Sequence, residues 1–238
     1  MKLDILAIGA HPDDIELSCS GTLLLHIAQG KSVGLIDLSK GEMGTRGTPE
    51  IRLQEGERAR QLMKAQTRDN LGFKDGALAN DYSHQQELIR YLRFYRPEIV
   101  LCNAPQDRHP DHGLAANLVA DACFYSGLTK RLSHWNQTEQ TAWRPRAVYH
   151  YIQDEFLKPD FVIDISSVIE EKRALIGCFA SQFYNPQSKE PETPISTKNF
   201  LQSVESKMAV FGRAIAADYA EGFICHRYPG VKSLFDLS

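Results

Sequence analysis

Several features that would assign the protein to a common class are missing from its sequence. No run of apolar residues approaches the roughly 20 that a membrane-spanning helix needs, so we expect no membrane partner. The chain also lacks an excess of positive charge, since 27 Lys and Arg against 30 Asp and Glu give a formal net charge of −3. Because nucleic-acid binding usually needs a basic patch, we expect no nucleic-acid partner either.

The chain also lacks the marks of a secreted protein. Its first apolar stretch is short, Asp4 interrupts it, and no small-residue cleavage site follows, so we expect a strand there and not a signal peptide. The cysteines are odd in number and scattered, with no C-x-x-C pair, which argues against a disulfide framework and against a cysteine-ligated zinc site. We expect a cytoplasmic protein in which most cysteines are small core residues. They are Cys19, Cys102, Cys123, Cys178 and Cys225.

Neither of the common glycine motifs for phosphate binding is present. The glycine-rich stretch 40–47 matches neither G-x-G-x-x-G nor G-x-x-x-x-G-K-[ST], so a nucleotide-binding role has weak support. The sequence also has no internal repeat, no low-complexity tract and no clear domain boundary. Its 238 residues, 42% of them hydrophobic, suffice for one α/β domain with a substantial core. We expect a single domain over residues 1–238.

Apolar runs alternate with segments of helical periodicity, which is typical of an α/β fold. The alternation predicts a mostly parallel sheet with helices on both faces and right-handed crossovers. Strands are expected at 3–10, 32–38, 68–71, 98–104, 147–152, 161–165 and 220–225. Helices are expected at 15–29, 49–65 (capped by Thr48), 84–95 (with a Ser83/Gln86 capping box), 113–126, 168–180 and 200–217. The segments 127–146 and 182–194 are predicted to be loops, the second a candidate lid.

Two short clusters of histidine and aspartate each follow a predicted strand. The first is Gly-Ala-His-Pro-Asp-Asp at 9–14, and the second is Asp-Arg-His-Pro-Asp-His at 107–112. In an open α/β sheet, ligands bind at the carboxyl ends of the strands. Histidine nitrogen and carboxylate oxygen are both good ligands for a divalent metal such as zinc. The two clusters therefore predict a metal site at that edge of the sheet.

The spacing within the clusters leaves the division of roles open. A catalytic metal typically takes about three protein ligands and keeps one open position, and His11, Asp14 and either histidine of the second cluster supply that number. The spacing equally allows Asp13 as the ligand and Asp14 as the free carboxylate, which can act as a general base. The free histidine, paired with Asp111, can be held as imidazolium to stabilise an oxyanion or protonate a leaving group. The ordinary alternative is a pair of turns in which an aspartate only caps a helix.

Arg52 falls in the first turn of the helix predicted at 49–65. The helix dipole disfavours a cation at that position, and this small cost marks Arg52 as a candidate ligand contact. The ordinary alternative is a solvated surface arginine.

Together these motifs resemble the LmbE-like family of zinc-dependent N-acetylglucosaminyl deacetylases. The resemblance rests on 9–14, on 107–112 and on Gly-Glu-Met-Gly-Thr-Arg-Gly-Thr at 41–48 with Ile-Arg at 51–52. Weaker matches at 158–161, 164–166, 181–183 and 219–223 spread it over nearly the whole chain. It is most similar to the bacillithiol-biosynthesis deacetylases, which remove acetate from N-acetylglucosaminyl malate. The resemblance implies a Rossmann-like α/β fold and a homo-oligomer such as a hexamer.

The resemblance also implies a mechanism and resolves which residues bind the metal. Carried onto this chain, it implies one zinc ion per subunit, bound by His11, Asp14 and His112. Zinc would polarise the acetamide carbonyl and bind the attacking water, while Asp13 takes the proton as general base. The oxyanion would be held by zinc and His109. The enzyme implied is a metal-dependent amidohydrolase.

The remaining roles implied by the resemblance concern charge around the substrate. Asp111 would hold the neighbouring histidine charged, and Arg52 would contact the substrate. Because malate is a dianion, Arg46 and Arg108 are further candidates to bind it. One departure stands out: some relatives have a late tyrosine that helps to hold the oxyanion, and this chain has Phe200 where that tyrosine would fall.

Three other functions fit the residues less completely. The nearest is deacetylation of a different N-acetylglucosamine conjugate or of a chitin disaccharide. A metal-dependent phosphoesterase commonly uses two metals, and the ligand count here is low for two. A non-catalytic Rossmann-like binding module leaves the histidines and carboxylates without a role. The same ligands also accept divalent ions other than zinc.

Overall fold

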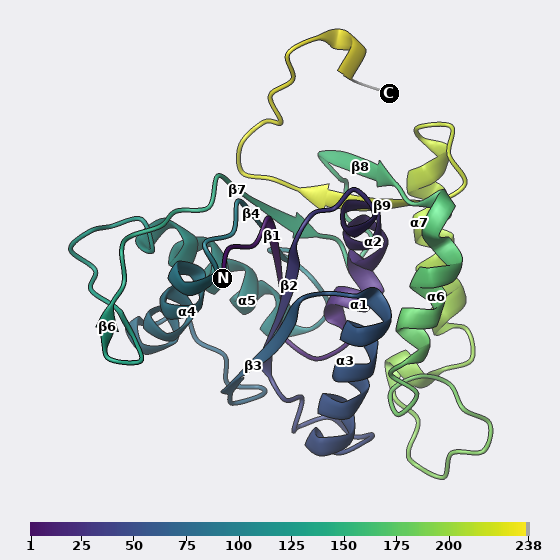
Figure 1. The fold of residues 1–238 in the computed structure, drawn as a ribbon. Coiled ribbons are helices and arrows are strands. Elements are labelled where there is room, and N and C mark those ends of the chain that lie inside the picture. The colour runs from purple at the N-terminus through teal and green to yellow at the C-terminus, as the bar shows by residue number, and fades with distance from the viewer. Residues whose placement is uncertain (237–238) are drawn as a thin grey trace.

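A seven-stranded sheet in the order β3-β2-β1-β4-β7-β9-β8 forms the centre of the protein, of which the computed structural model describes residues 1–236 (Figure 1). The first five strands in this order pair in parallel, and β9 runs antiparallel to both β7 and β8. This arrangement confirms the expected α/β fold with a mostly parallel sheet. The strands are β1 (Ile5–Gly9), β2 (Val33–Ser39), β3 (Thr67–Phe73), β4 (Ile99–Asn103), β7 (Ala147–Tyr151), β8 (Phe161–Asp164) and β9 (Ala220–Ile224).

Helices cover both faces of the sheet, as expected (Figure 1). Successive residues of β1 alternate between two hydrophobic clusters: Leu6 and Ile8 pack with α4 and α5 on one face, and Ile5 and Ala7 pack with α1–α3 and α6 on the other. A strand buried on both sides needs apolar residues at every position, which explains the continuous apolar run in the sequence. The helices are α1 (Asp14–Ser18), α2 (Ser20–Ala28), α3 (Pro49–Met63), α4 (Tyr82–Tyr95), α5 (Pro110–Tyr125), α6 (Ile169–Gly177) and α7 (Phe200–Arg213).

The expected strands are confirmed, with each end shifted by two residues at most. The helix expected at 15–29 is instead broken at Cys19 into α1 and α2. A buried ion pair from later elements holds the break, since Glu221 on β9 accepts hydrogen bonds from the backbone N–H groups of Gly21 and Thr22. Lys172 on α6 donates to two carbonyl groups of α1 at 3.0 Å each. Side chains distant in sequence thereby supply hydrogen-bond partners for carbonyl groups of α1 and for N–H groups at the start of α2.

Two predictions about helix starts were wrong, and one about a loop was incomplete. The cap of α4 is Asp81, whose Oδ1 accepts from the backbone N–H of His84, so the Ser83/Gln86 capping box does not set the start of this helix. Helix α5 begins at Pro110, earlier than expected, with His109 as its N-cap. The segment 127–146, expected to be a loop, contains a short hairpin of β5 (His134–Trp135) and β6 (Thr138–Glu139).

The topology brings the two clusters together. β1 and β4 are neighbours in parallel, while the chain leaving β1 returns through β2 on the opposite side. Such a reversal of strand order creates the crevice in which open α/β sheets bind ligands. The backbone N–H of Ala10, after β1, donates to Oδ1 of Asn103, at the end of β4, at 3.0 Å. The segments 9–14 and 107–112 therefore leave the sheet side by side.

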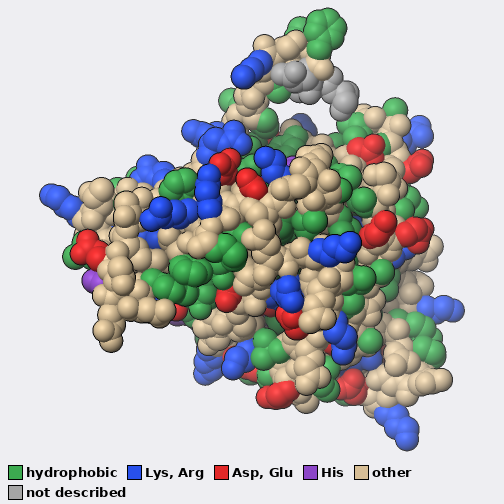
Figure 2. All heavy atoms as spheres, in the orientation of Figure 1, with side chains coloured by type: hydrophobic (Ala, Val, Ile, Leu, Met, Phe, Trp, Pro, Cys, Tyr) green, Lys and Arg blue, Asp and Glu red, His purple; other side chains and the backbone are tan. Residues whose placement is uncertain are grey.

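Figure 2 shows basic and acidic side chains interspersed over one face of the molecule. Among residues 1–236, no helix is long and apolar enough to cross a membrane. All five cysteines are free, and Cys19, Cys102 and Cys123 are buried, which agrees with their expected place in the core.

Candidate active site

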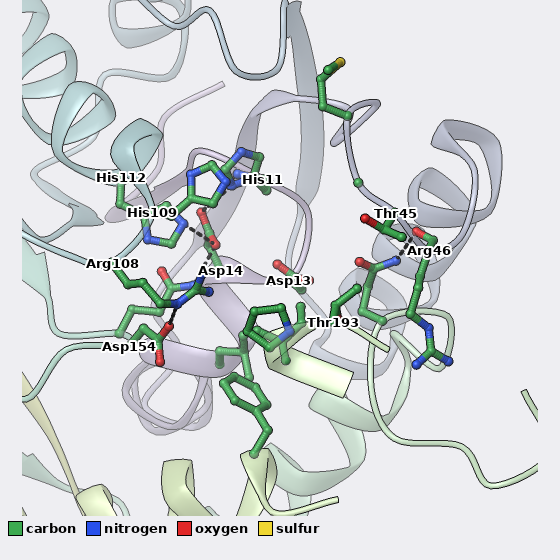
Figure 3. Close-up of a pocket in the computed structure, with 18 of the residues that line it drawn as sticks. His11, Asp13, Asp14, Thr45, Arg46, Arg108, His109, His112, Asp154 and Thr193 are labelled. Carbon is green, nitrogen blue, oxygen red and sulfur yellow. Dashed lines mark hydrogen bonds and ion pairs between the residues drawn. The ribbon is translucent and has the colours of Figure 1, made fainter. Parts of the chain in front are cut away.

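A cavity of about 310 Å³ lies where β1 and β4 end. The histidine and aspartate clusters form part of its lining, and Figure 3 shows their side chains pointing toward one another. A volume of this order suits a small-molecule ligand. Another part of the lining is apolar and comes from α1, from η2 (Pro194–Ser196) and from α7; its residues are Leu17, Pro194, Ile195, Phe200 and Val204.

The turn from β1 into α1 places His11 next to Asp14. The backbone N–H of His11 donates to Asp14 Oδ2 at 3.0 Å, and the backbone N–H of Asp14 donates to the His11 carbonyl at 3.3 Å. A Cβ atom at Gly9 would lie 3.0 Å from the Asp14 Cβ, so a side chain at this position would crowd the turn. Asp13 adopts a φ of 112°, and Figure 3 shows its carboxylate beside that of Asp14 at the cavity.

The Asp14 carboxylate lies close to both His11 and His112 at the cavity. Asp14 Oδ1 lies 3.3 Å from His112 Nε2, and Asp14 Oδ2 lies 3.8 Å from His11 Nδ1. All three residues are buried. One ring nitrogen from each of His11, His109 and His112 also lies within 4.8 Å of the other two. A buried set of two or three histidines and one carboxylate around a cavity fits a catalytic zinc ion with an open position.

The charges of these groups support one another. Burial alone would raise the pKa of Asp14, but the positive charge of His112 and its hydrogen bond to Asp14 hold that pKa well below its usual value. Burial opposes protonation of His112, yet Asp14 and Asp107 raise its pKa to about 10. Burial likewise opposes protonation of His11, whereas hydrogen bonds to Asp111 and Asp75 raise its pKa to about 9. The neighbouring carboxylates therefore favour the protonated form of both histidines.

A carboxylate orients each of His11 and His112 by contacting the ring nitrogen that faces away from Asp14. Asp107 Oδ2 lies 2.6 Å from His112 Nδ1, which turns Nε2 toward Asp14. Asp75 Oδ1 lies 3.0 Å from His11 Nε2, which turns Nδ1 toward Asp14. A carboxylate behind a histidine ligand is a common arrangement at metal sites.

Sequence reasoning missed Asp75 and two amides that hold Asp14. Asp75 follows β3 at the same edge of the sheet, but the strand expected at 68–71 ended too early to indicate this. The side-chain amide groups of Asn103, which ends β4, and Gln153, which follows β7, donate to Asp14 at 3.0 and 2.7 Å. Their position in the sequence could have indicated them, since each of the three residues ends or follows a strand of the parallel sheet.

The structure contradicts the expected pairing of His109 with Asp111. Asp111 Oδ2 accepts the backbone N–H of Gly76 at 2.9 Å and lies 3.5 Å from His11 Nε2. His109 Nδ1 instead accepts the backbone N–H of Asp111 at 3.3 Å, because His109 is the N-cap of α5. Burial, together with the nearby charge of His11, lowers the pKa of His109. The lowered pKa favours the neutral ring over the imidazolium that the sequence suggested.

Asp13 has the environment that a general base requires. Its carboxylate is buried, and burial raises its pKa to about 7 although the charge of Arg52 opposes the shift. A base with a pKa near the working pH transfers protons most effectively. Its ion-pair partner is Arg52, whose Nη2 lies 3.2 Å from Asp13 Oδ2.

The three candidate arginines lie in different environments. Arg52 is buried and engaged with Asp13. Arg108 is about half exposed at the histidine side of the cavity and forms an ion pair with Asp154. Arg46 is buried, lies 3.7 Å from Glu190, and Figure 3 shows its side chain directed away from the histidines. Of the three, Arg108 is the one best placed to meet a substrate near the histidines.

The late part of the chain lines the cavity without a tyrosine. Phe200, which stands where the late tyrosine of some relatives would fall, lines the cavity. The segment 182–193 contains no helix or strand, and Glu190 within it accepts the backbone N–H of Gly47 at 3.0 Å. The Gln182 amide donates to the Arg46 carbonyl. The loops 40–48 and 182–194 are thus joined beside the cavity.

Comparisons with known proteins identify relatives of this chain. The family model described as "PIG-L: GlcNAc-PI de-N-acetylase" matches residues 6–123, which include both clusters. A diacetylchitobiose deacetylase from Thermococcus kodakarensis is 29% identical over 194 residues, covering 75% of this chain and 70% of that protein. A 4-oxalmesaconate hydratase from Pseudomonas putida is 26% identical over 194 residues, covering 74% of this chain and 73% of that protein. The solved structure of the conserved protein TT1542 from Thermus thermophilus superposes with a TM-score of 0.86 at 32% identity, covering 98% of both chains.

Proposed function

Because this chain belongs to the PIG-L/LmbE-like deacetylase family, we propose that it is a metal-dependent hydrolase that removes the acetyl group from an N-acetylglucosamine conjugate. One observation carries the proposal. A buried set of metal-ligand side chains, His11, Asp14 and His112, lies next to the buried carboxylate of Asp13 at one cavity. A Lewis acid together with a base is one established arrangement for the hydrolysis of an amide.

The proposed metal is one zinc ion held by His11, Asp14 and His112, with another divalent ion as the alternative. When bound, it would polarise the acetyl carbonyl and lower the pKa of a water molecule. Asp75 and Asp107 keep the two histidine ligands in the required orientation.

The chain's own groups then move the protons. Asp13 accepts a proton from the attacking water as the new C–O bond forms, and returns it to the amine nitrogen as the C–N bond breaks. His109 Nδ1 accepts a backbone N–H, so its neutral ring carries the proton on Nε2 and can donate a hydrogen bond to the oxyanion. This assigns His109 the role of a neutral donor, and Asp111 the role of a second carboxylate behind His11.

The proposed substrate is N-acetylglucosaminyl L-malate, which would place the protein in bacillithiol biosynthesis. The support is the motif resemblance, together with the half-exposed guanidinium of Arg108 beside the histidines, which can meet a carboxylate. The alternative is a neutral substrate such as a chitin disaccharide, on which the Thermococcus relative acts by its name.

We also propose that the protein is a cytoplasmic homo-oligomer such as a hexamer. The support is the segment after β9, which runs away from the body in Figure 1 and exposes Tyr228, Leu234 and Phe235 almost completely. Apolar side chains grouped in this way commonly mark an interface. Light scattering on the purified protein measures the assembly directly, and a monomer at micromolar concentration would contradict the proposal.

Acetate release from three substrates tests the proposed function. The panel is N-acetylglucosaminyl malate, N,N′-diacetylchitobiose and N-acetylglucosamine, each with and without a chelator. Fast turnover of the malate conjugate, lost on chelation and restored by zinc, is the expected result. Cleavage of the disaccharide alone would keep the deacetylase and discard the malate substrate. No acetate from any of the three, with hydration of 4-oxalmesaconate instead, would favour the activity named for the Pseudomonas relative.

A further inference from the structure

A lysine on α7 binds two successive carbonyl groups. Lys207 Nζ donates to the carbonyl of Gln153 and, at 2.8 Å, to the carbonyl of Asp154, in the segment that follows β7. A lysine on a helix surface can ordinarily extend its ammonium into water. The acidic residue two positions earlier on the helix, Glu205, pairs with Arg173 instead. The inward turn of Lys207 toward the backbone therefore indicates a specific contact.

The two peptide units that Lys207 binds face a carboxylate on their other side. The backbone N–H of Asp154 donates to Asp107 Oδ2 at 3.4 Å, and that of Glu155 donates to Asp107 Oδ1 at 2.8 Å. In a trans peptide the C=O and N–H groups point in opposite directions, and no cis peptide bond occurs within the described residues. Each of the two peptide planes is therefore bound by Lys207 at one edge and by Asp107 at the other.

Asp107 in turn contacts the proposed zinc ligand His112. Its Oδ2 lies 2.6 Å from His112 Nδ1, and its side chain is only 1% exposed. A buried carboxylate needs hydrogen-bond donors, and successive backbone N–H groups commonly form a cradle for an anion. The N–H groups of Asp154 and Glu155 form such a cradle, and the N–H of Arg108 adds a third donor at 2.9 Å.

The ammonium of Lys207 strengthens this cradle. A carbonyl that accepts a hydrogen bond from an ammonium is polarised, which makes the N–H of the same peptide unit a stronger donor. The segment 153–155 lies in neither a helix nor a strand, so no regular backbone pairing holds its peptide planes. Lys207 therefore fixes the orientation of the donors that hold Asp107.

Lys207 does not act as a substrate contact or through the other amide beside the metal position. It is not among the residues that line the large cavity. The Gln153 side chain does line that cavity and donates to Asp14 at 2.7 Å, but it is held separately by Asn103, whose Nδ2 donates to Gln153 Oε1 at 3.2 Å. The route from Lys207 to the metal position therefore runs through Asp107.

We infer that Lys207 is a positioning residue for the zinc ligand His112, acting through two peptide units and Asp107, an inference that rests on the metal site proposed above. Lys207 fixes the peptide planes, their N–H groups fix Asp107, and Asp107 keeps His112 Nε2 directed toward the metal position. Groups that orient a metal ligand increase the affinity for the metal. Loss of the ammonium should therefore weaken zinc binding, although Lys207 contacts neither the metal position nor a ligand.

Competition with a chromogenic chelator measures the zinc affinity of Lys207 variants. Lys207→Met removes the ammonium and keeps an unbranched side chain, and it should weaken zinc binding by about 10-fold, the lower end of the effect usual for groups that orient metal ligands. Lys207→Arg keeps a cation that can bind two carbonyls and should recover part of the loss. The matched control is Arg213→Met, at an exposed position in the last turn of α7, which should bind zinc as the wild type does. Wild-type affinity in Lys207→Met would overturn the inference.

A double-mutant cycle tests the route through Asp107. In an Asp107→Asn background, Lys207→Met should weaken zinc binding by less than about twofold more, because the carboxylate through which it acts is already gone. A general structural effect of Lys207 would persist in that background. Losses of affinity that multiply in the double variant would therefore overturn the inference.

A crystal structure of metal-free Lys207→Met tests the geometry without zinc or substrate. The peptide units between 153 and 155 should rotate, or the contact between Asp107 and His112 should lengthen beyond hydrogen-bond distance. An unchanged segment with an unchanged contact would overturn the inference, even if the wild type cleaved none of the acetylated sugars. Failure of the wild type on the whole substrate panel would instead count against the proposed function alone.

Discussion

The Asp14 carboxylate lies 3.3 Å from Nε2 of His112, although the two residues leave different strands. This contact joins the two clusters and defines the proposed metal position. His112→Ala removes one ligand and leaves two, so we expect the purified variant to lose most of its zinc and its activity. Elemental analysis gives the metal content. His134→Ala, on the exposed hairpin, is the matched control and should keep the wild-type zinc content; equal zinc in both variants would remove His112 from the ligand set.

The carboxylates behind the histidines should affect metal affinity without abolishing it. Asp75→Asn and Asp107→Asn each replace a charged partner of a proposed ligand by a neutral one. We expect each variant to bind zinc about 10- to 100-fold more weakly, the effect usual for groups that orient metal ligands. Competition with a chromogenic chelator measures the affinity. Wild-type affinity in both variants would show that these contacts do not orient the ligands.

Zinc binding should strengthen as the pH rises. The pKa values of His11 and His112 are raised to about 9 and about 10 in the metal-free protein, so at pH 7 both rings carry a proton that the metal must displace. Raising the pH toward these values removes the competing protons and therefore increases the affinity. Calorimetry at pH 7 in buffers of different ionisation enthalpy should show proton release on zinc binding. No net release would contradict the charged state assigned to the two histidines.

The ion pair between Lys172 and Glu221 should contribute strongly to stability. Lys172 Nζ lies 2.7 Å from Glu221 Oε1, and both side chains are buried at the break between α1 and α2. Glu221→Gln leaves the ammonium without its countercharge, which typically costs about 3–5 kcal/mol in the free energy of unfolding.

Urea denaturation measures this loss. Glu98→Gln, which removes one partner of the exposed pair Lys2–Glu98, is the control and should cost less than about 1 kcal/mol. Similar midpoints for the two variants would mean that the buried pair does not hold the helix break.

The sequence predicted the parts of the site that local spacing determines. His11 and Asp14 are joined by one turn after an apolar strand, and the parallel pairing of β1 with β4 brings the second cluster to the same edge. Asp75 could not be predicted in this way, because its contact with His11 depends on how the loop after β3 reaches across the sheet edge.

The errors have a common physical cause. His109 and Asp111 were expected to pair because they are close in sequence, but a side chain that caps a helix turns back to the backbone, which separates the two groups. The break between α1 and α2 is imposed by Lys172 and Glu221, far along the chain. Tertiary contacts of this kind leave no local pattern in the sequence.

The central claim is that a metal and Asp13 together hydrolyse an acetylated sugar, and one comparison tests it most directly. Acetate release is measured for chelator-stripped wild type, zinc-restored wild type and zinc-loaded Asp13→Asn on the best substrate of the panel. We expect turnover only after zinc is restored, and about 10²- to 10⁴-fold slower turnover by Asp13→Asn with its zinc retained. Full activity of the stripped protein, or of zinc-loaded Asp13→Asn, would contradict the account.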